Sequence, residues 1–103
     1  MTVEEKLDAI ADPERRQILL ALHLQDPEVD APLDFREFVS ENRLDLAKLY
    51  HSSLPKLSKY GLIEWDTRSR KISRGPDFER IDPLITLLYE HQDELPSDWF
   101  TAE

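Results

Sequence analysis

The side chains of this chain that could bind a partner are lysines and arginines, and most of them lie in one segment. Residues 46–76 carry seven bases against two acids, a net charge of +5, whereas the segments before and after each carry −7. The seven bases are Lys48, Lys56, Lys59, Arg68, Arg70, Lys71 and Arg74. Lysine and arginine donate hydrogen bonds to phosphates and to base edges. This segregation predicts a local patch for an anionic partner, and nucleic acid is the partner we expect.

Other kinds of chemistry find little support in the sequence. The chain has no cysteine and only two glycines, and it contains no phosphate-binding loop or nucleophile motif. Near its end His91 lies beside three acids, Glu90, Asp93 and Glu94. One imidazole among flexible acids falls short of the three or four well-placed ligands that metal sites need. We therefore expect no enzyme activity, no cofactor and no metal site.

Length and composition predict one soluble domain. A chain of 103 residues forms a single domain, here 1–103, with one modest core. It has no apolar run near the roughly 18–20 residues that span a bilayer, and its first residues lack the apolar stretch of a signal peptide. A cytoplasmic protein without membrane contact is expected. Its 22 acids against five lysines favour a halophilic host, although a merely acidic mesophilic protein remains the alternative.

The elements that must position the bases begin with three helices. Thr2 and Glu5 have capping-box spacing and predict a first helix, and Asp12 followed by Pro13 predicts the start of a second. The prolines and acids of residues 25–32 predict a loop. Asp34 then caps a short third helix that ends near residue 42.

The fourth helix carries the first bases. It is predicted to begin at Asp45 and to end at Gly61, a residue type suited to the left-handed position after a helix. At 100° per residue, one face gathers Leu46, Ala47, Tyr50, Leu54 and Leu57 for packing, and the other gathers Lys48, Ser52, Pro55, Lys56 and Lys59. Pro55 cannot donate to the carbonyl of His51, so a kink or an irregular helix is expected there.

A hairpin and a last helix complete the predicted order. Residues 62–66 and 71–74 have the pattern of two short strands, with Arg68 and Arg70 at the tip between them. Asp82 and Pro83 predict the start of a final helix that carries apolar side chains inward at Ile81, Leu84, Ile85, Leu88 and Leu95. The expected fold is mainly α with a small β-hairpin (α+β).

Two stretches resemble a known family. Residues 9–19, AIADPERRQIL, and residues 53–63, SLPKLSKYGLI, are similar to segments of the ArsR-type winged helix-turn-helix regulators, and the acidity adds a resemblance to small haloarchaeal winged-helix proteins. The order helix, helix, helix, helix, hairpin, helix agrees with that fold. The resemblance implies a helix-turn-helix at about 34–60, a wing at about 62–74 and a C-terminal helix at about 81–95. It also implies a transcriptional regulator that binds double-stranded DNA.

The resemblance and the charge pattern together assign roles to residues. Lys48, Ser52 and Lys56 are expected in the major groove with His51 on the flank of that face, and the wing is expected on the backbone or minor groove. The full predicted DNA-binding set is Lys48, His51, Ser52, Lys56, Lys59, Arg68, Arg70, Lys71 and Arg74. A homodimer through the first and last helices is implied, with Leu7, Leu84, Leu87 and Leu88 at its interface.

Three alternatives stay open at this level. The basic stretch could bind an acidic protein partner of the transcription machinery, in a winged-helix interaction module without sequence-specific DNA binding. The bases could simply be solvated or neutralise neighbouring acids. The apolar side chains of the terminal helices could close the core of a monomer instead of forming a dimer.

Overall fold

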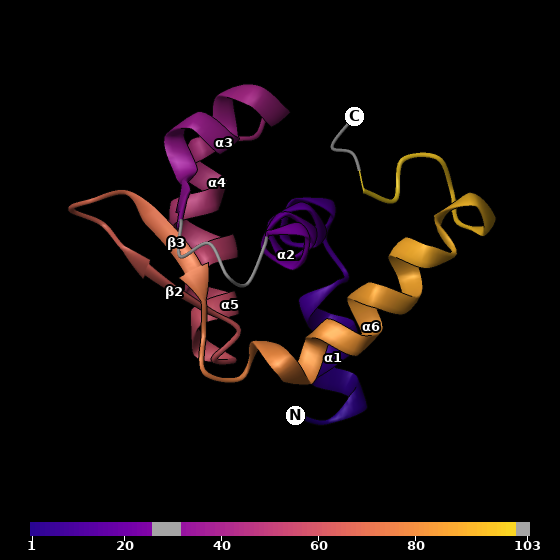
Figure 1. Ribbon diagram of the computed structural model, residues 1–103. Helices are drawn as coiled ribbons and strands as arrows, with labels where there is room; N and C mark the ends of the chain where they lie inside the picture. The colour runs from indigo at the N-terminus through magenta and orange to yellow at the C-terminus, as the bar shows by residue number, and fades with distance from the viewer. Residues whose placement is uncertain (26–31, 101–103) are drawn as a thin grey trace.

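The computed structural model describes residues 1–25 and 32–100 and has the expected α+β class (Figure 1). Its helices are α1 (Val3–Ala9), α2 (Pro13–Leu24), α3 (Phe35–Asn42), α4 (Leu46–Lys48), the π turn η1 (Leu49–Ser53), α5 (Leu54–Lys59), α6 (Phe78–Glu90) and the 3₁₀ turn η2 (Gln92–Glu94). Its strands are β1 (Leu33–Asp34), β2 (Ile63–Asp66) and β3 (Lys71–Arg74). Over the described ranges, no helix has the length and apolar character needed to cross a membrane.

The predicted caps start the helices. Thr2 and Glu5 form the capping box of α1, and Asp12, Asp34 and Asp45 each accept hydrogen bonds from backbone N–H groups in the first turn of the helix that follows. Gly61, with a φ of 75°, lies in the left-handed conformation after α5. The predicted starts of the first four helices are therefore confirmed. Most of the loop predicted over 25–32 falls at 26–31, outside the described residues.

The sheet has three antiparallel strands in the order β1-β3-β2. The hairpin β2–β3 is confirmed, and Trp65 pairs with Ile72 across it. Strand β1 was not predicted, because two residues are too few to show a period-2 pattern. Leu33 pairs with Ile72, and Asp34 with Lys71, so the start of α3 lies against the tip half of the hairpin.

The core forms around α2, which Figure 1 shows end-on between α4–α5 and α6. Ile18, Leu19 and Leu22 of α2 are fully buried, together with Phe35 of α3 and Ile72 of the hairpin. Burying such side chains stabilises the fold by about 1.5–3 kcal/mol each relative to leaving them exposed. The hairpin tip projects away from this core, on the opposite side of α2 from α6.

The packing face predicted for the fourth helix is partly wrong. Leu54 and Leu57 are buried as expected, but Leu46 and Ala47 are exposed, and Leu49 and Ser53 are buried in addition. The cause is the π turn, in which the N–H of Leu54 donates to the carbonyl of Leu49, five residues earlier. A uniform 100° per residue does not apply across such a turn. Pro55 follows directly as the second residue of α5, so the expected irregularity takes the form of a π turn.

The predicted start of the last helix is also wrong. Helix α6 begins at Phe78 and ends at Glu90, and Pro83 lies inside it. Phe78 is only 4% exposed, and its burial extends the helix toward the hairpin. The ring of Pro83 faces solvent, where a missing N–H is best tolerated. Ile81 and Ile85 are fully buried, whereas Leu84, Leu88 and Leu95 are partly buried.

The two glycines of the chain meet where the helix α4–α5, the hairpin and α6 join. A Cβ atom on Gly75 would lie 2.4 Å from the carbonyl oxygen of Gly61 and 2.7 Å from the backbone nitrogen of Ile63. The N–H of Asp77 donates to the same Gly61 oxygen at 2.8 Å, and the N–H of Gly75 donates to Leu62 at 2.9 Å. No other residue type fits at Gly75 without moving the backbone.

Candidate nucleic-acid interface

The first turn of α2 holds the helix α4–α5 in place. Asp12 accepts hydrogen bonds from the N–H groups of Glu14 and Arg15, and its second carboxylate oxygen accepts from Lys48 Nζ at 2.5 Å. Glu14 Oε1 accepts a 2.8 Å hydrogen bond from Ser53 Oγ, and both of these side chains are buried. Burial raises the pKa of the Glu14 carboxyl above its ordinary value.

A second link runs from α1 to the end of α5. The carboxylate of Asp8 accepts from Tyr60 Oη at 2.6 Å and from Lys56 Nζ at 2.9 Å. The hydrogen bond from Tyr60, and then that from Lys56, holds the pKa of Asp8 below its usual range. Burial opposes the ionisation of Asp12, but the hydrogen bond from Lys48 and its other interactions outweigh this, so the pKa of Asp12 is lowered too. Two predicted DNA-binding lysines therefore have carboxylate partners within the chain.

The two arginines of the same α2 turn bind neighbouring segments. Arg15 donates to the carbonyl oxygens of Asp8 and Ala9 at 2.7 and 3.2 Å, which closes the end of α1. Arg16 donates to Trp99 O at 2.7 Å, and its guanidinium lies 4.3 Å from the centroid of the Trp99 ring. The charged residues of the ADPERRQIL stretch are thus engaged inside the fold.

The solvent face of α4–α5 is small and mixed in character. It exposes Ala47, Lys48, His51, Ser52, Pro55, Ser58 and Lys59, at intervals of three and four residues. Of the bases predicted for this helix, Lys59 is exposed and, within the described residues, has no ion pair. The side chains of His51 and Ser52 are likewise exposed without an intramolecular hydrogen bond among the residues described. Among the described residues, this face is open to solvent, and only its Lys48 is held in an ion pair.

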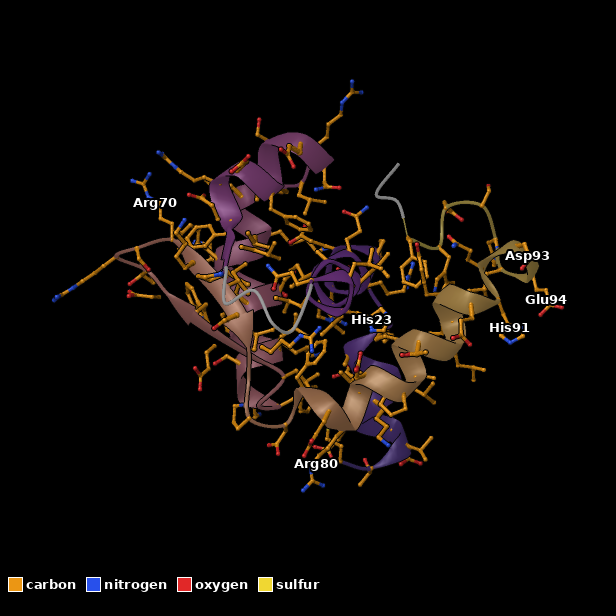
Figure 2. The ribbon with its side chains drawn as sticks, viewed as in Figure 1. His23, Arg70, Arg80, His91, Asp93 and Glu94 are labelled. Atoms are coloured by element: carbon orange, nitrogen blue, oxygen red, sulfur yellow. The ribbon has the colours of Figure 1, made fainter. Side chains whose placement is uncertain are left out.

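The hairpin tip presents two unpaired arginines. Arg68 and Arg70 are exposed, and neither guanidinium has a hydrogen bond or ion pair in the part of the chain that the structure describes. Arg70 has a φ of 59°, a left-handed conformation that glycine and asparagine favour and that costs another residue about 1–2 kcal/mol. Figure 2 shows Arg70 at the end of the hairpin and Arg80 far from it, at the beginning of α6. The backbone of Arg70 closes the tip, because its N–H donates to Asp66 O at 2.8 Å, and its guanidinium is left in solvent.

The other two cations of the hairpin, Arg74 at its base and Lys71 beside its tip, are engaged within the fold. Arg74 donates to Leu22 O at 2.7 and 3.0 Å and to His23 O at 3.2 Å, at the end of α2. Its guanidinium also lies 4.9 Å from the centroid of the Phe78 ring. Lys71 lies 3.5 Å from the carboxylate of Asp34. Arg74 therefore closes the C-terminus of α2, and we leave it out of the interface.

The DNA-binding set predicted from the sequence does not include two further exposed arginines. Arg36 in the first turn of α3 and Arg43 at its end are exposed and, among the described residues, form no ion pair. The N–H of Phe35 donates to Arg70 O at 3.0 Å, which brings the start of α3 to the hairpin tip. Arg43 has a φ of 54°, again left-handed. Both arginines belong to a segment with a net acidic charge, so no charge count could single them out.

The predicted dimer residues divide into two groups. Leu7 of α1 and Leu87 of α6 are 55% and 54% exposed, whereas Leu84 and Leu88 are partly buried against the core. Val3 of α1, which was not predicted, is 66% exposed. These three exposed side chains are apolar surface that the described fold leaves open to solvent.

Two of the three histidines, His23 and His91, have local partners. His23 Nδ1 lies 2.5 Å from Asp82 Oδ1, which links α2 to α6. His91 Nδ1 lies 3.3 Å from Glu94 Oε2, and Figure 2 shows both residues with Asp93 at the far end of α6. Across 1–25 and 32–100, no group of three or more histidine and carboxylate side chains is placed to hold a metal ion.

Comparisons with known proteins add no relative. No protein-family model matches the chain, and neither the curated proteins nor the solved structures give a significant match. Function must therefore be argued from the residues and their geometry.

Proposed function

We propose that the chain is a winged helix-turn-helix regulator of transcription that binds double-stranded DNA. The order of its elements and the strand order β1-β3-β2 support this reading of the fold, with α3 and α4–α5 as the helix-turn-helix and β2–β3 as the wing. The resemblance of residues 9–19 and 53–63 to ArsR-type regulators supports it independently. A groove-binding helix beside a basic wing is the arrangement that such proteins use.

One observation carries the proposal. In a chain with a net charge of −9, the exposed cations that have no ion pair among the described residues include Arg68 and Arg70 at one hairpin tip and Lys59 on the adjoining helix. The tip projects away from the core, so both guanidinium groups can meet a partner without a change in the fold. A projecting tip with two guanidinium groups suits phosphates or the minor groove.

The contacts divide by residue type and exposure. We assign Arg68, Arg70 and Lys59 to phosphates, and His51 and Ser52 to base edges in the major groove. Lys48, Lys56 and Lys71 are half-exposed ion-pair partners worth about 0–1 kcal/mol each, so phosphates can compete for them. Arg36 and Arg43 extend the phosphate-binding set.

Titration of duplex DNA with matched arginine variants tests the proposal. Arg70→Ala should weaken binding to all duplexes and flatten the salt dependence by about one unit of slope. Arg80→Ala is the control, since Arg80 is also an exposed arginine but lies at the start of α6 and pairs with Asp77 at 3.2 Å. Equal effects of the two changes would contradict a specific role for the tip. Binding of an acidic protein with no duplex binding would favour the interaction module.

We propose further that the chain is a homodimer through α1 and α6. Leu7 and Leu87 supply exposed apolar surface, and a small domain gains stability by sharing it. Leu87→Glu should convert the dimer to a monomer in light scattering. Leu24→Glu, on an equally exposed leucine at the end of α2, should leave the dimer intact. A wild-type monomer at micromolar concentration would overturn this assignment.

We also propose a halophilic, archaeal source and a cytoplasmic location, and the charge balance supports the halophilic part. Acids outnumber bases 22 to 13, and salt screens the repulsion among the acidic side chains. The melting temperature should therefore rise between tens of millimolar and molar potassium chloride. A flat or falling melting temperature would remove the halophilic part of the proposal.

A further inference from the structure

The groove-facing side of α4–α5 has few free charges at its centre. Ala47 and Pro55 are exposed there, with Ser52 and Ser58 beside them. The ammonium group of Lys48, which starts on the same face, is turned to Asp12. Lys48, the cation that could bind guanine here, is therefore held by Asp12. The small apolar groups of Ala47 and Pro55 remain exposed to a partner.

The π turn makes this apolar surface available. A proline in a regular helix removes a hydrogen bond and crowds the preceding turn. Here Leu54 already donates five residues back, to Leu49, and Pro55 follows at the second position of α5 with its ring in solvent. Ala47 and Pro55 are eight residues apart, a separation of about 12 Å along a helix. That distance corresponds to roughly three to four base pairs of duplex.

The chemistry of the major groove then identifies the target. Its base edges carry hydrogen-bond donors and acceptors, and the one apolar group among them is the 5-methyl group of thymine. We infer that Ala47 and Pro55 determine specificity by packing on thymine methyl groups, so that the preferred duplex has thymines at two points a few base pairs apart. This inference rests on the proposed DNA-binding function and names the sequence feature that it reads.

Deoxyuridine substitution tests the inference, because it removes only the methyl group. Duplexes bound by the full chain are first selected from a random library, and each thymine of the selected site is then replaced in turn. Each contacted methyl should be worth about fourfold in Kd, the effect of burying one such group. Thymines outside the selected site serve as the internal control and should show no effect.

Combining deoxyuridine substitution with a protein variant shows which residue contacts each methyl group. Ala47→Ser adds one hydroxyl to the β-carbon and makes the contacting surface polar, so the variant should lose most of the fourfold difference between thymine and deoxyuridine at one position. Pro55→Ala should diminish the difference at the second position, with circular dichroism to establish that the helix is kept.

The outcomes separate the two proposals. If no duplex binds, the DNA-binding function fails and the inference fails with it. If duplexes bind with a sequence preference that deoxyuridine leaves unchanged, the function stands and the methyl contacts are refuted. If Ala47→Ser retains the full thymine preference at every position, Ala47 is not the residue that reads it.

Discussion

The helix α4–α5 and the hairpin β2–β3 carry all seven bases of residues 46–76, but their bases have different partners. In the helix, Lys48 and Lys56 are bound to Asp12 and Asp8, which come from α2 and α1. In the hairpin, Arg74 at the base and Lys71 beside the tip are bound, and the two tip arginines are free within the described structure. Charge in the sequence therefore overstates the charge that a partner can meet. Two of the three lysines of the helix hold it against α1 and α2, whereas the two arginines at the hairpin tip are available to a partner.

The largest expected effect separates the base of the hairpin from its tip. Arg74→Ala removes several charge-assisted hydrogen bonds at the end of α2 and should lower the free energy of unfolding by about 2–3 kcal/mol. In a domain of this size the melting temperature should fall by roughly 10–20 °C. Arg68→Ala, the control at the tip, should leave it nearly unchanged. Similar losses for both variants in a thermal melt would remove the contrast.

The next largest expected effect is a difference in duplex binding between two lysine variants of the helix α4–α5. Lys59→Ala should flatten the salt dependence of duplex binding by about one unit of slope, which is about tenfold in affinity over a tenfold change in salt. Lys56→Ala should have a smaller effect, because its ammonium is shared with Asp8. Lys6→Ala, on α1, is the control for a loss of charge alone. If Lys56 proved the more important lysine, its ion pair would not limit its contact with DNA.

Releasing a bound lysine should strengthen binding by a smaller factor. Asp12→Asn keeps a good helix cap but removes the charge that holds Lys48, so duplex affinity should rise about two- to fivefold. Asp77→Asn releases Arg80 at the start of α6 in the same way and serves as the control. An equal gain from both changes in a binding titration would mean that net charge, not Lys48, is responsible.

The smallest effect concerns the buried Glu14. Its pKa is raised from an ordinary 4.5, so the folded state binds the proton more tightly than the unfolded state, and stability is lost as pH rises through the folded pKa. Glu14→Gln should therefore be more stable than the wild type at neutral pH, by less than about 1 kcal/mol, and equal to it near pH 4. The difference between the two unfolding curves isolates this group from Asp8 and Asp12, whose lowered pKa values act in the opposite sense. A difference independent of pH would contradict the argument.

Much of the fold could be predicted because its signals are local. Each of the first four helices begins at a side chain that accepts hydrogen bonds from N–H groups two or three residues later, and such spacing is readable in the sequence. The hairpin was equally readable from two short apolar patterns and a polar tip. The last helix was misplaced because Asp82 and Pro83 imitate a helix start, while the burial of Phe78, which decides the real start, depends on distant contacts.

The candidate site could be predicted only in outline. The segment that carries the bases was identified, but the state of each base depends on partners far away in the chain. Lys48 meets a carboxylate 36 residues earlier, and Arg74 meets carbonyl groups 49 to 52 residues earlier. Helical periodicity likewise could not reveal a π turn, which exchanged Ala47 for Leu49 on the packed face.

The contact between Gly61 and Gly75 has a mechanical consequence. The last residue of β3 and the first residue of α6 are separated by only three residues, and this short link is fastened to the end of α5 by backbone hydrogen bonds. The close approach of the two glycines and these hydrogen bonds restrict rotation at this link. The hairpin and α6 should therefore rotate together as one rigid body. In a dimer joined through α6, the separation of the two hairpin tips would be a fixed dimension, and a small rotation at the α6 interface would be magnified at the tips.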